Sequence, residues 1–171
     1  LMKSKKNIVL IGMMGSGKSL IGKVLSKKLN LDFIDIDNKI EKSENKTISD
    51  IFKKNGENYF RKLEENLSIN YLALENKIIS LGGGGYINPI IRKQCEKNCM
   101  SVWLNWKDEI LINRIKNSNK RPLAMKLNSS EIKKLIVDRS KIYNSSNHKI
   151  NCDKLDKKQI VKKIIKLYAN T

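Results

Sequence analysis

The chain has 171 residues, of which 40% are hydrophobic and 30% are charged. This length and composition exclude an intrinsically disordered chain and indicate one globular domain, residues 1–171, with a sizeable core. The three cysteines, Cys95, Cys99 and Cys152, are an odd number without the spacing of a disulfide scaffold. They predict reduced thiols and therefore a cytoplasmic protein.

Charge and apolar patterning also limit the partners. The formal net charge is +18, which raises the possibility of a nucleic-acid partner. Lysines are spread along the whole chain, however, with no arginine-rich block and no alternation of basic and aromatic residues. No apolar run approaches the roughly 20 residues of a membrane-spanning helix, and the first is too short for a signal peptide. We expect small-molecule partners, no nucleic acid, no membrane, and a monomer.

Short apolar runs alternate with segments of helical periodicity. The expected strands are 8–11, 33–37, 77–81, 101–104 and 148–152. The expected helices are 20–29, 38–43, 60–74, 132–143 and 160–168. This alternation predicts an α/β fold of three layers, with a parallel sheet and helices on both faces. Ligands of such sheets bind at the carboxyl ends of the strands.

A glycine-rich motif follows the first expected strand. It matches G-x-x-x-x-G-K-[ST] in full and is called the P-loop below: Gly12, Met13, Met14, Gly15, Ser16, Gly17, Lys18 and Ser19. In such a loop, glycines let backbone N–H groups surround phosphate oxygens, and the lysine reaches the β- and γ-phosphates. The Ser19 hydroxyl can ligate Mg²⁺, and the helix that begins near Leu20 adds its positive dipole end. The sequence therefore predicts a site for ATP with Mg²⁺.

Two acids end the second expected strand. Asp35 and Asp37 are two residues apart, so on a strand both side chains point the same way, toward the expected γ-phosphate. Carboxylates there can hold the waters of Mg²⁺ and accept a proton from an attacking hydroxyl. An alternative is that Asp37 only caps the helix that follows. The sequence alone leaves both interpretations open.

Further motifs give the chain a family resemblance. They are Phe33-Ile34-Asp35-Ile36-Asp37, Phe60-Arg61 with Glu64, Gly82-Gly83-Gly84, Arg121-Pro122-Leu123, and Arg139 with Tyr143. In order and spacing the chain resembles the shikimate kinases from residue 8 to its last helix. The resemblance implies a five-stranded parallel sheet of the nucleoside-monophosphate-kinase type with a lid, at about 113–127. It also implies transfer of the ATP γ-phosphate to the 3-hydroxyl of shikimate, in aromatic amino-acid biosynthesis.

The resemblance assigns roles residue by residue. The implied shikimate-binding residues are Asp37, Phe52, Phe60, Arg61, Gly83, Gly84 and Arg139. The implied ATP-binding residues are Gly12, Met14, Gly15, Ser16, Gly17, Lys18, Ser19, Leu20, Arg114, Arg121 and Asp153. Ser19 and Asp35 would hold Mg²⁺, and Lys18, Asp37 and Arg121 would act in catalysis. The arginines Arg61 and Arg139 would bind the shikimate carboxylate, a task suited to planar guanidinium groups.

Each implied role has a simpler alternative. Arg61 is placed to form a surface ion pair with Glu57 or Glu65, and Arg139 could lie on a solvated helix face. Phe52 and Phe60 could be core residues. Arginine is scarce in this chain beside lysine, which favours function for those that match a motif. Arg92 matches none and is expected to be solvated.

The sequence contains two tryptophans. Trp103 and Trp106 flank the fourth strand and are expected to pack in or near the core.

Two other classes of protein would share the P-loop. A gluconate or nucleotide kinase would have the P-loop but not the pairing of F-R-x-x-E with G-G-G. A P-loop switch or nucleic-acid motor would hydrolyse ATP under the control of a polymer and would need no small hydroxyl acceptor.

Overall fold

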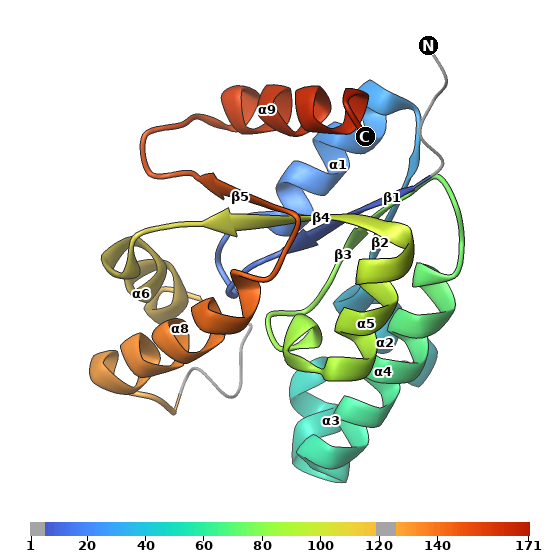
Figure 1. Ribbon diagram of the computed structural model, residues 1–171. Helices are drawn as coiled ribbons and strands as arrows, with labels where there is room; N and C mark the ends of the chain where they lie inside the picture. Colours follow the sequence, from blue (N-terminus) through green and yellow to red (C-terminus); the bar gives the residue numbers. More distant parts are fainter. Residues whose placement is uncertain (1–5, 119–125) are drawn as a thin grey trace.

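The computed structural model describes residues 6–118 and 126–171, and its centre is one parallel five-stranded sheet with strand order β2-β3-β1-β4-β5 (Figure 1). The strands are β1 (Asn7–Ile11), β2 (Asp32–Asp35), β3 (Lys77–Ser80), β4 (Cys99–Asn105) and β5 (His148–Asn151). The helices are α1 (Lys18–Leu29), α2 (Ile36–Glu44), α3 (Ile48–Asn55), α4 (Glu57–Leu72), α5 (Pro89–Asn98), α6 (Asp108–Lys116), α8 (Ser129–Tyr143) and α9 (Lys157–Ala169), with the short 3₁₀ helix η1 (Gly85–Ile87).

The alternation of side chains along β1 explains why helices cover both faces of the sheet. Ile8 and Leu10 point into one core with α1 and α9, whereas Val9 and Ile11 point into the other, with α2, α3, α4, α5, α6 and α8. All four side chains are completely buried. A strand that is buried on both faces reads as a continuous apolar run, which is why the sequence identified this strand. The predicted α/β fold with three layers is confirmed.

The second strand is shorter than predicted. It ends at Asp35, whose carboxylate accepts a hydrogen bond from the Asn38 N–H at 3.3 Å and so caps α2. Asp37 therefore lies in the first turn of α2 rather than on the strand. The expectation that Asp35 and Asp37 share a strand face was wrong, and so was the alternative that Asp37 caps this helix.

Other boundaries also differ from the expectations. The list of helices expected from periodicity contained none at α3, α5 or α6. The expected lid, 113–127, overlaps the last turn of α6, and its residues 119–125, Arg121 among them, lie outside the described residues. All three cysteines are free and buried. Within residues 6–118 and 126–171, no helix combines the length and the apolar character needed to cross a membrane.

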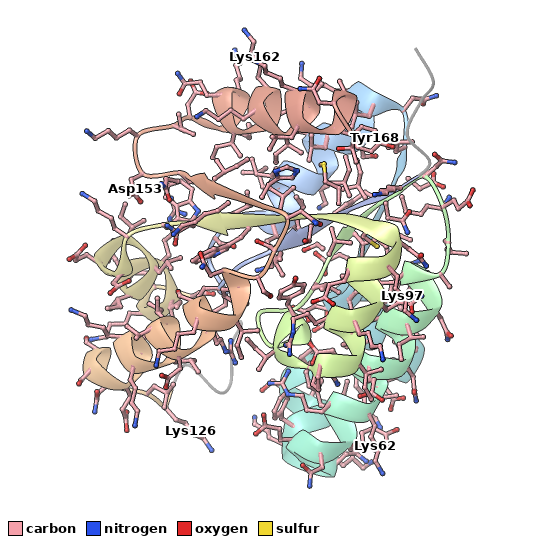
Figure 2. All side chains as sticks on the ribbon, in the orientation of Figure 1. Lys62, Lys97, Lys126, Asp153, Lys162 and Tyr168 are labelled. Carbon is pink, nitrogen blue, oxygen red and sulfur yellow. The ribbon has the colours of Figure 1, made fainter. Side chains whose placement is uncertain are left out.

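The positive charge is distributed over the molecule. Lys62 on α4, Lys97 on α5, Lys126 before α8 and Lys162 on α9 project from different sides (Figure 2). This distribution fits the interpretation that the lysines are spread over the solvated surface of the whole molecule.

The order of the strands brings three loops together. In the sheet β3 lies between β1 and β2, and Ser80 at its end is in register with Leu10 on one side and Asp35 on the other. The P-loop follows β1, Asp35 ends β2, and the glycine loop of residues 81–85 follows β3. Because the strands are parallel, these loops meet at one edge of the sheet.

Candidate active site

The P-loop has the backbone geometry of an anion-binding loop. Gly15 and Gly17 have φ angles of 80° and 89°, in the left-handed region that residues with a Cβ rarely adopt. Gly17 precedes α1, whose N-terminus has no side-chain cap, so its first N–H groups can face an anion. The Lys18 ammonium is buried against the loop and donates to the carbonyls of Gly12 at 2.8 Å and Met13 at 2.9 Å. The loop therefore has the geometry that a phosphate site requires.

Two side chains that carry oxygen atoms lie beside this loop. The Ser19 hydroxyl donates a hydrogen bond to Asp35 Oδ2, which joins the start of α1 to the end of β2. Mg²⁺ prefers oxygen ligands and takes only one or two from the protein, with the rest from water and phosphate. In the described part of the chain, no group of three or more His, Cys, Asp or Glu could hold a metal. Ser19 and Asp35 thus fit an ion that arrives with a nucleotide.

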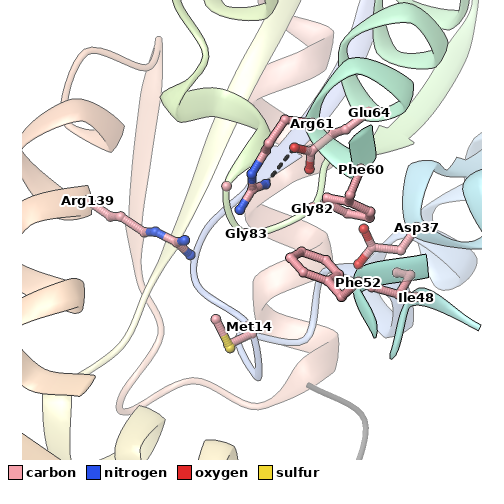
Figure 3. A pocket seen from close by; sticks show the side chains of 11 residues that line it. Met14, Asp37, Ile48, Phe52, Phe60, Arg61, Glu64, Gly82, Gly83 and Arg139 are labelled. Carbon is pink, nitrogen blue, oxygen red and sulfur yellow. Dashed lines mark hydrogen bonds and ion pairs between the residues drawn. The ribbon is translucent and has the colours of Figure 1, made fainter. Parts of the chain in front are cut away.

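A cavity opens next to the P-loop and brings together all seven residues predicted for the acceptor site (Figure 3). The residues that line it are Met14, Asp37, Ile48, Phe52, Phe60, Arg61, Glu64, Gly82, Gly83, Gly84 and Arg139. The rings of Phe52 and Phe60 pack at 4.7 Å between centroids and form an apolar wall. Arg61 and Arg139 approach from α4 and α8, on opposite sides of the glycine loop. The cavity therefore combines an apolar wall with two cations and two acids.

Arg61 is held in place by two acids of its own helix. Its Nη1 donates to Glu64 Oε2 at 2.6 Å, and its Nη2 donates to Glu57 Oε1 at 3.2 Å. Burial alone would lower the pKa of Arg61, but the two carboxylates raise it above the ordinary value. The predicted surface pair with Glu57 exists, and Glu64 replaces the alternative partner Glu65. Arg61 forms these pairs and lines the cavity at the same time.

Glu64 is a buried acid of the cavity that the sequence showed only as part of a motif. Its side chain is 2% exposed, and burial raises its pKa while Arg61 opposes that shift and Asp37 adds to it. Oε2 is paired with Arg61, but Oε1 has no hydrogen-bond partner within the described chain. A buried polar atom without a partner is costly, so Oε1 is a natural acceptor for a ligand hydroxyl or a water.

The glycine loop leaves the space that both arginines occupy. A Cβ atom at Gly84 would lie 2.5 Å from Arg61 Nη1, and one at Gly83 would lie 3.2 Å from Arg139 Nη1. Gly84 has φ −95°, which any residue can adopt. The glycine is therefore required here by the approach of the guanidinium group and not by the backbone torsion.

Tyr143 holds the glycine loop by a hydrogen bond and was not among the predicted site residues. Its hydroxyl donates to the Gly83 carbonyl, its ring packs on Trp103 at 5.8 Å, and its side chain is buried. Burial raises the pKa of Tyr143 to about 12, so the phenol stays protonated and remains a donor at neutral pH. One helical turn before it, Arg139 Nη1 contacts Met13 Sδ at 3.9 Å. Arg139 thus faces the cavity and does not lie on a solvated helix face.

A second cavity lies on the other side of the P-loop. It is lined by Gly15, Ser16, Gly17, Leu20, Ile21, Trp106, Arg114, Leu155, Lys157 and Ile160. Leu20, the third residue of α1, is 54% exposed here and lies outside the buried core. Arg114 Nη1 donates to the Gly15 carbonyl at 3.1 Å. A third cavity, lined by Met14, Gly15, Asp37 and Arg114 among others, connects the first two along the P-loop.

Asp153 was predicted to bind ATP, but it does not line the cavity beside Arg114. Asp153 Oδ1 accepts a hydrogen bond from the Lys107 N–H at 2.7 Å and fixes the loop after β4 instead. Arg121 lies outside the described residues. Arg92, expected to be solvated, is half-buried and donates to the carbonyls of Tyr86 and Ile87, both at 3.1 Å. Arg92 therefore stabilises the backbone of η1, which follows the glycine loop.

Comparison with known proteins identifies the family. The shikimate kinase family model matches residues 14–169. The chain is 41% identical to a shikimate kinase of Persephonella marina over 160 residues, which cover 94% of this chain and 97% of that one. The chain belongs to the shikimate kinase family.

Solved structures agree with this assignment. A shikimate kinase of Aquifex aeolicus has a TM-score of 0.85 at 37% identity, and the match covers 96% of each chain. A shikimate kinase of Acinetobacter baumannii in complex with shikimate has a TM-score of 0.92 at 26% identity, covering 98% of this chain and 95% of that one. The predicted family is confirmed, and with it the kinase fold and the enzyme class.

Proposed function

We propose that this shikimate kinase family member transfers the γ-phosphate of ATP to the 3-hydroxyl of shikimate. Shikimate would bind in the cavity of Figure 3, with its carboxylate between Arg61 and Arg139 and its ring against Phe52 and Phe60. The observation that carries the proposal is the convergence of two arginines from α4 and α8 on one cavity beside the P-loop. Paired guanidinium groups bind a carboxylate with defined orientation.

The nucleotide would bind on the other side of the P-loop. The cavity beside Arg114 would hold the base, and the P-loop would hold the phosphates between the two ligands. Lys18 would leave its contacts with Gly12 and Met13 for the β- and γ-phosphate oxygens. Mg²⁺, held through Ser19 and Asp35, would neutralise charge on the phosphates.

Asp37 would orient the reacting hydroxyl. It lines both the acceptor cavity and the connecting cavity, so it would lie between the two bound ligands. A carboxylate at this point can accept a hydrogen bond from the attacking hydroxyl and take its proton as the bond to phosphorus forms. Arg121 is proposed to approach the transferring phosphoryl group from the lid. The enzyme is proposed to act as a monomer in the cytoplasm, with small molecules as its only partners.

The proposal is tested by ADP release from Mg·ATP with and without shikimate. Gluconate and a polynucleotide serve as controls for the two other classes of protein. We expect release to depend on shikimate and to be unaffected by the controls. Turnover that depends on gluconate or on the polynucleotide, without an effect of shikimate, would refute the proposal.

Gly84→Ala tests the space between the loop and Arg61. The added Cβ would displace the guanidinium group, which is the movable end of its side chain. We expect the KM for shikimate to rise roughly tenfold, the size of one lost hydrogen bond to a charged group, while the KM for ATP stays the same. Gly85→Ala is the matched control, because its Cβ would be at an ordinary 3.4 Å from Leu81. Equal effects of the two variants would contradict this role of Gly84.

Tyr143→Phe tests the support of the glycine loop. The variant keeps the ring but leaves the buried Gly83 carbonyl without its donor. We expect the free energy of unfolding to fall by about 1–3 kcal/mol in urea denaturation, and the KM for shikimate to rise severalfold. Tyr59→Phe, which loses an exposed hydrogen bond to Glu44, is expected to change neither quantity. An unchanged KM in Tyr143→Phe would show that the loop needs no such support.

A further inference from the structure

Trp106 connects three parts of the nucleotide side of the molecule. It follows directly after β4, and its indole Nε1 donates to the Ser16 carbonyl of the P-loop at 2.9 Å. The guanidinium carbon of Arg114, from α6, lies 4.1 Å from the centre of its ring system. The half-buried indole packs against both hydrophobic cores and also lines the cavity beside the P-loop. The sequence had placed Trp106 in or near the core, without a task at the cavity.

Arg114 needs such a support to present a defined surface. An arginine side chain has many rotamers, and a flat aromatic face restricts the guanidinium group to a stacked orientation. The second contact of Arg114, from Nη1 to the Gly15 carbonyl at 3.1 Å, fixes its position along that face. The guanidinium group thus lies over the Trp106 ring, and Arg114 lines the cavity together with Leu20 and Leu155.

We infer that Trp106 is a positioning residue for the nucleotide, which holds Arg114 and the Ser16 peptide in one fixed arrangement. The inference rests on the proposed binding of ATP in this cavity. By stacking on Arg114, the indole would hold the planar guanidinium group in position against the base of the nucleotide. Through its N–H group, it would fix the peptide of the P-loop that precedes Gly17 and Lys18. Its loss should weaken the binding of nucleotide and leave the binding of shikimate unchanged.

Trp103 provides the contrast within the same chain. It lies inside β4, is 4% exposed, and packs against Tyr143 in the core. Lys149 lies above its ring at 4.5 Å, a cation–aromatic contact that resembles that of Arg114 but lines none of the three cavities described above. Lys149→Met therefore removes a contact of the same kind at a place where no effect on the nucleotide is expected.

The experiment measures ADP binding by calorimetry, together with the KM values for ATP and shikimate. For Trp106→Leu we expect the Kd of ADP and the KM for ATP to rise about tenfold, with the KM for shikimate within twofold of the original. Trp106→Phe keeps an aromatic face for Arg114 but loses the N–H group, so we expect an intermediate rise. Lys149→Met should change none of these quantities. A parallel rise of both KM values, or no change in the Kd of ADP, would overturn the inference.

A double-mutant cycle with Arg114→Met shows whether Trp106 acts through Arg114. If it does, the effect of Trp106→Leu on ADP binding is smaller in the Arg114→Met background than in the wild-type protein, and what remains is the share carried by the bond to Ser16. Full additivity would overturn the role through Arg114. Should Trp106→Leu fail to fold, Trp106→Phe alone tests the bond to the Ser16 peptide, and an unchanged Kd of ADP in that variant would overturn it. ADP binding is measured without shikimate, so it tests Trp106 even if the wild-type protein fails to phosphorylate shikimate, a result that would refute only the proposed function.

Discussion

Lys18→Met is expected to lower kcat by roughly 100-fold or more, the effect typical of losing one positioned group that stabilises charge in a transition state. Lys18 belongs to the P-loop, where the phosphates are proposed to bind, and its ammonium lies against the loop carbonyls of Gly12 and Met13. Methionine keeps the length of the side chain and removes the charge. The rate is measured as ADP release at saturating ATP and shikimate.

The neighbouring lysine of the same helix supplies the control. Lys23 is exposed on α1, and Lys23→Met should retain the original kcat. Shikimate binding, followed by calorimetry, should be unchanged in both variants, because Lys18 does not line the acceptor cavity. A Lys18→Met enzyme with nearly full kcat would show that the phosphates bind elsewhere.

Arg139→Met is expected to raise the KM for shikimate by roughly 10- to 150-fold, equivalent to the ~1.5–3 kcal/mol of a hydrogen bond to a charged group. Arg139 is half-buried at the cavity, and its partner there would be the carboxylate of the substrate. The methionine fills a similar volume without charge. Because Arg139 lines neither the cavity beside Arg114 nor the connecting one, the KM for ATP should not change.

Lys141→Met is the control for this variant. Lys141 lies on the same helix, α8, and forms an exposed ion pair with Asp138 that contributes little to stability. Both KM values should remain at the original level in this control. An Arg139→Met enzyme in which the KM for ATP rises as much as that for shikimate would contradict the assignment of Arg139 to the carboxylate.

Much of the fold and of the phosphate loop could be predicted from short patterns of residues. The apolar run of β1 and the P-loop motif could be read directly, because strand burial and phosphate binding depend on residues close together in sequence. The family resemblance named seven acceptor-site residues from five parts of the chain, and one cavity contains all of them. The resemblance placed them together, whereas periodicity alone could not have done so.

The main error was the assignment of residues 36 and 37 to the second strand, and it arose because a strand pattern and a helix pattern overlap there. The pattern from Phe33 to Asp37 alternates as in a strand, yet Ile36 and Ile40 are also spaced for a helix and both are fully buried. Asp35 caps that helix, so the strand ends there and Asp37 reaches the cavity from a helical turn. The choice between the two patterns depends on packing against the rest of the fold, which a short segment does not encode.

Glu64, Tyr143 and Trp106 could not be assigned their places from sequence because their tasks are defined by distant partners. Glu64 acts on Arg61 within one helix, but its burial depends on the glycine loop. Tyr143 and Trp106 donate to carbonyls 60 and 90 residues away. A tyrosine or tryptophan at helical or strand spacing is more often a core residue, and nothing in its neighbours distinguishes the two cases.

The most direct test of the proposed acceptor site compares shikimate with its methyl ester as substrates of the wild-type enzyme. The ester keeps the ring and every hydroxyl but carries no charge for Arg61 and Arg139. If the two arginines bind the carboxylate, kcat/KM for the ester should be lower than that for shikimate by roughly 100-fold or more. Equal values of kcat/KM for the two compounds would contradict the binding of the carboxylate between Arg61 and Arg139.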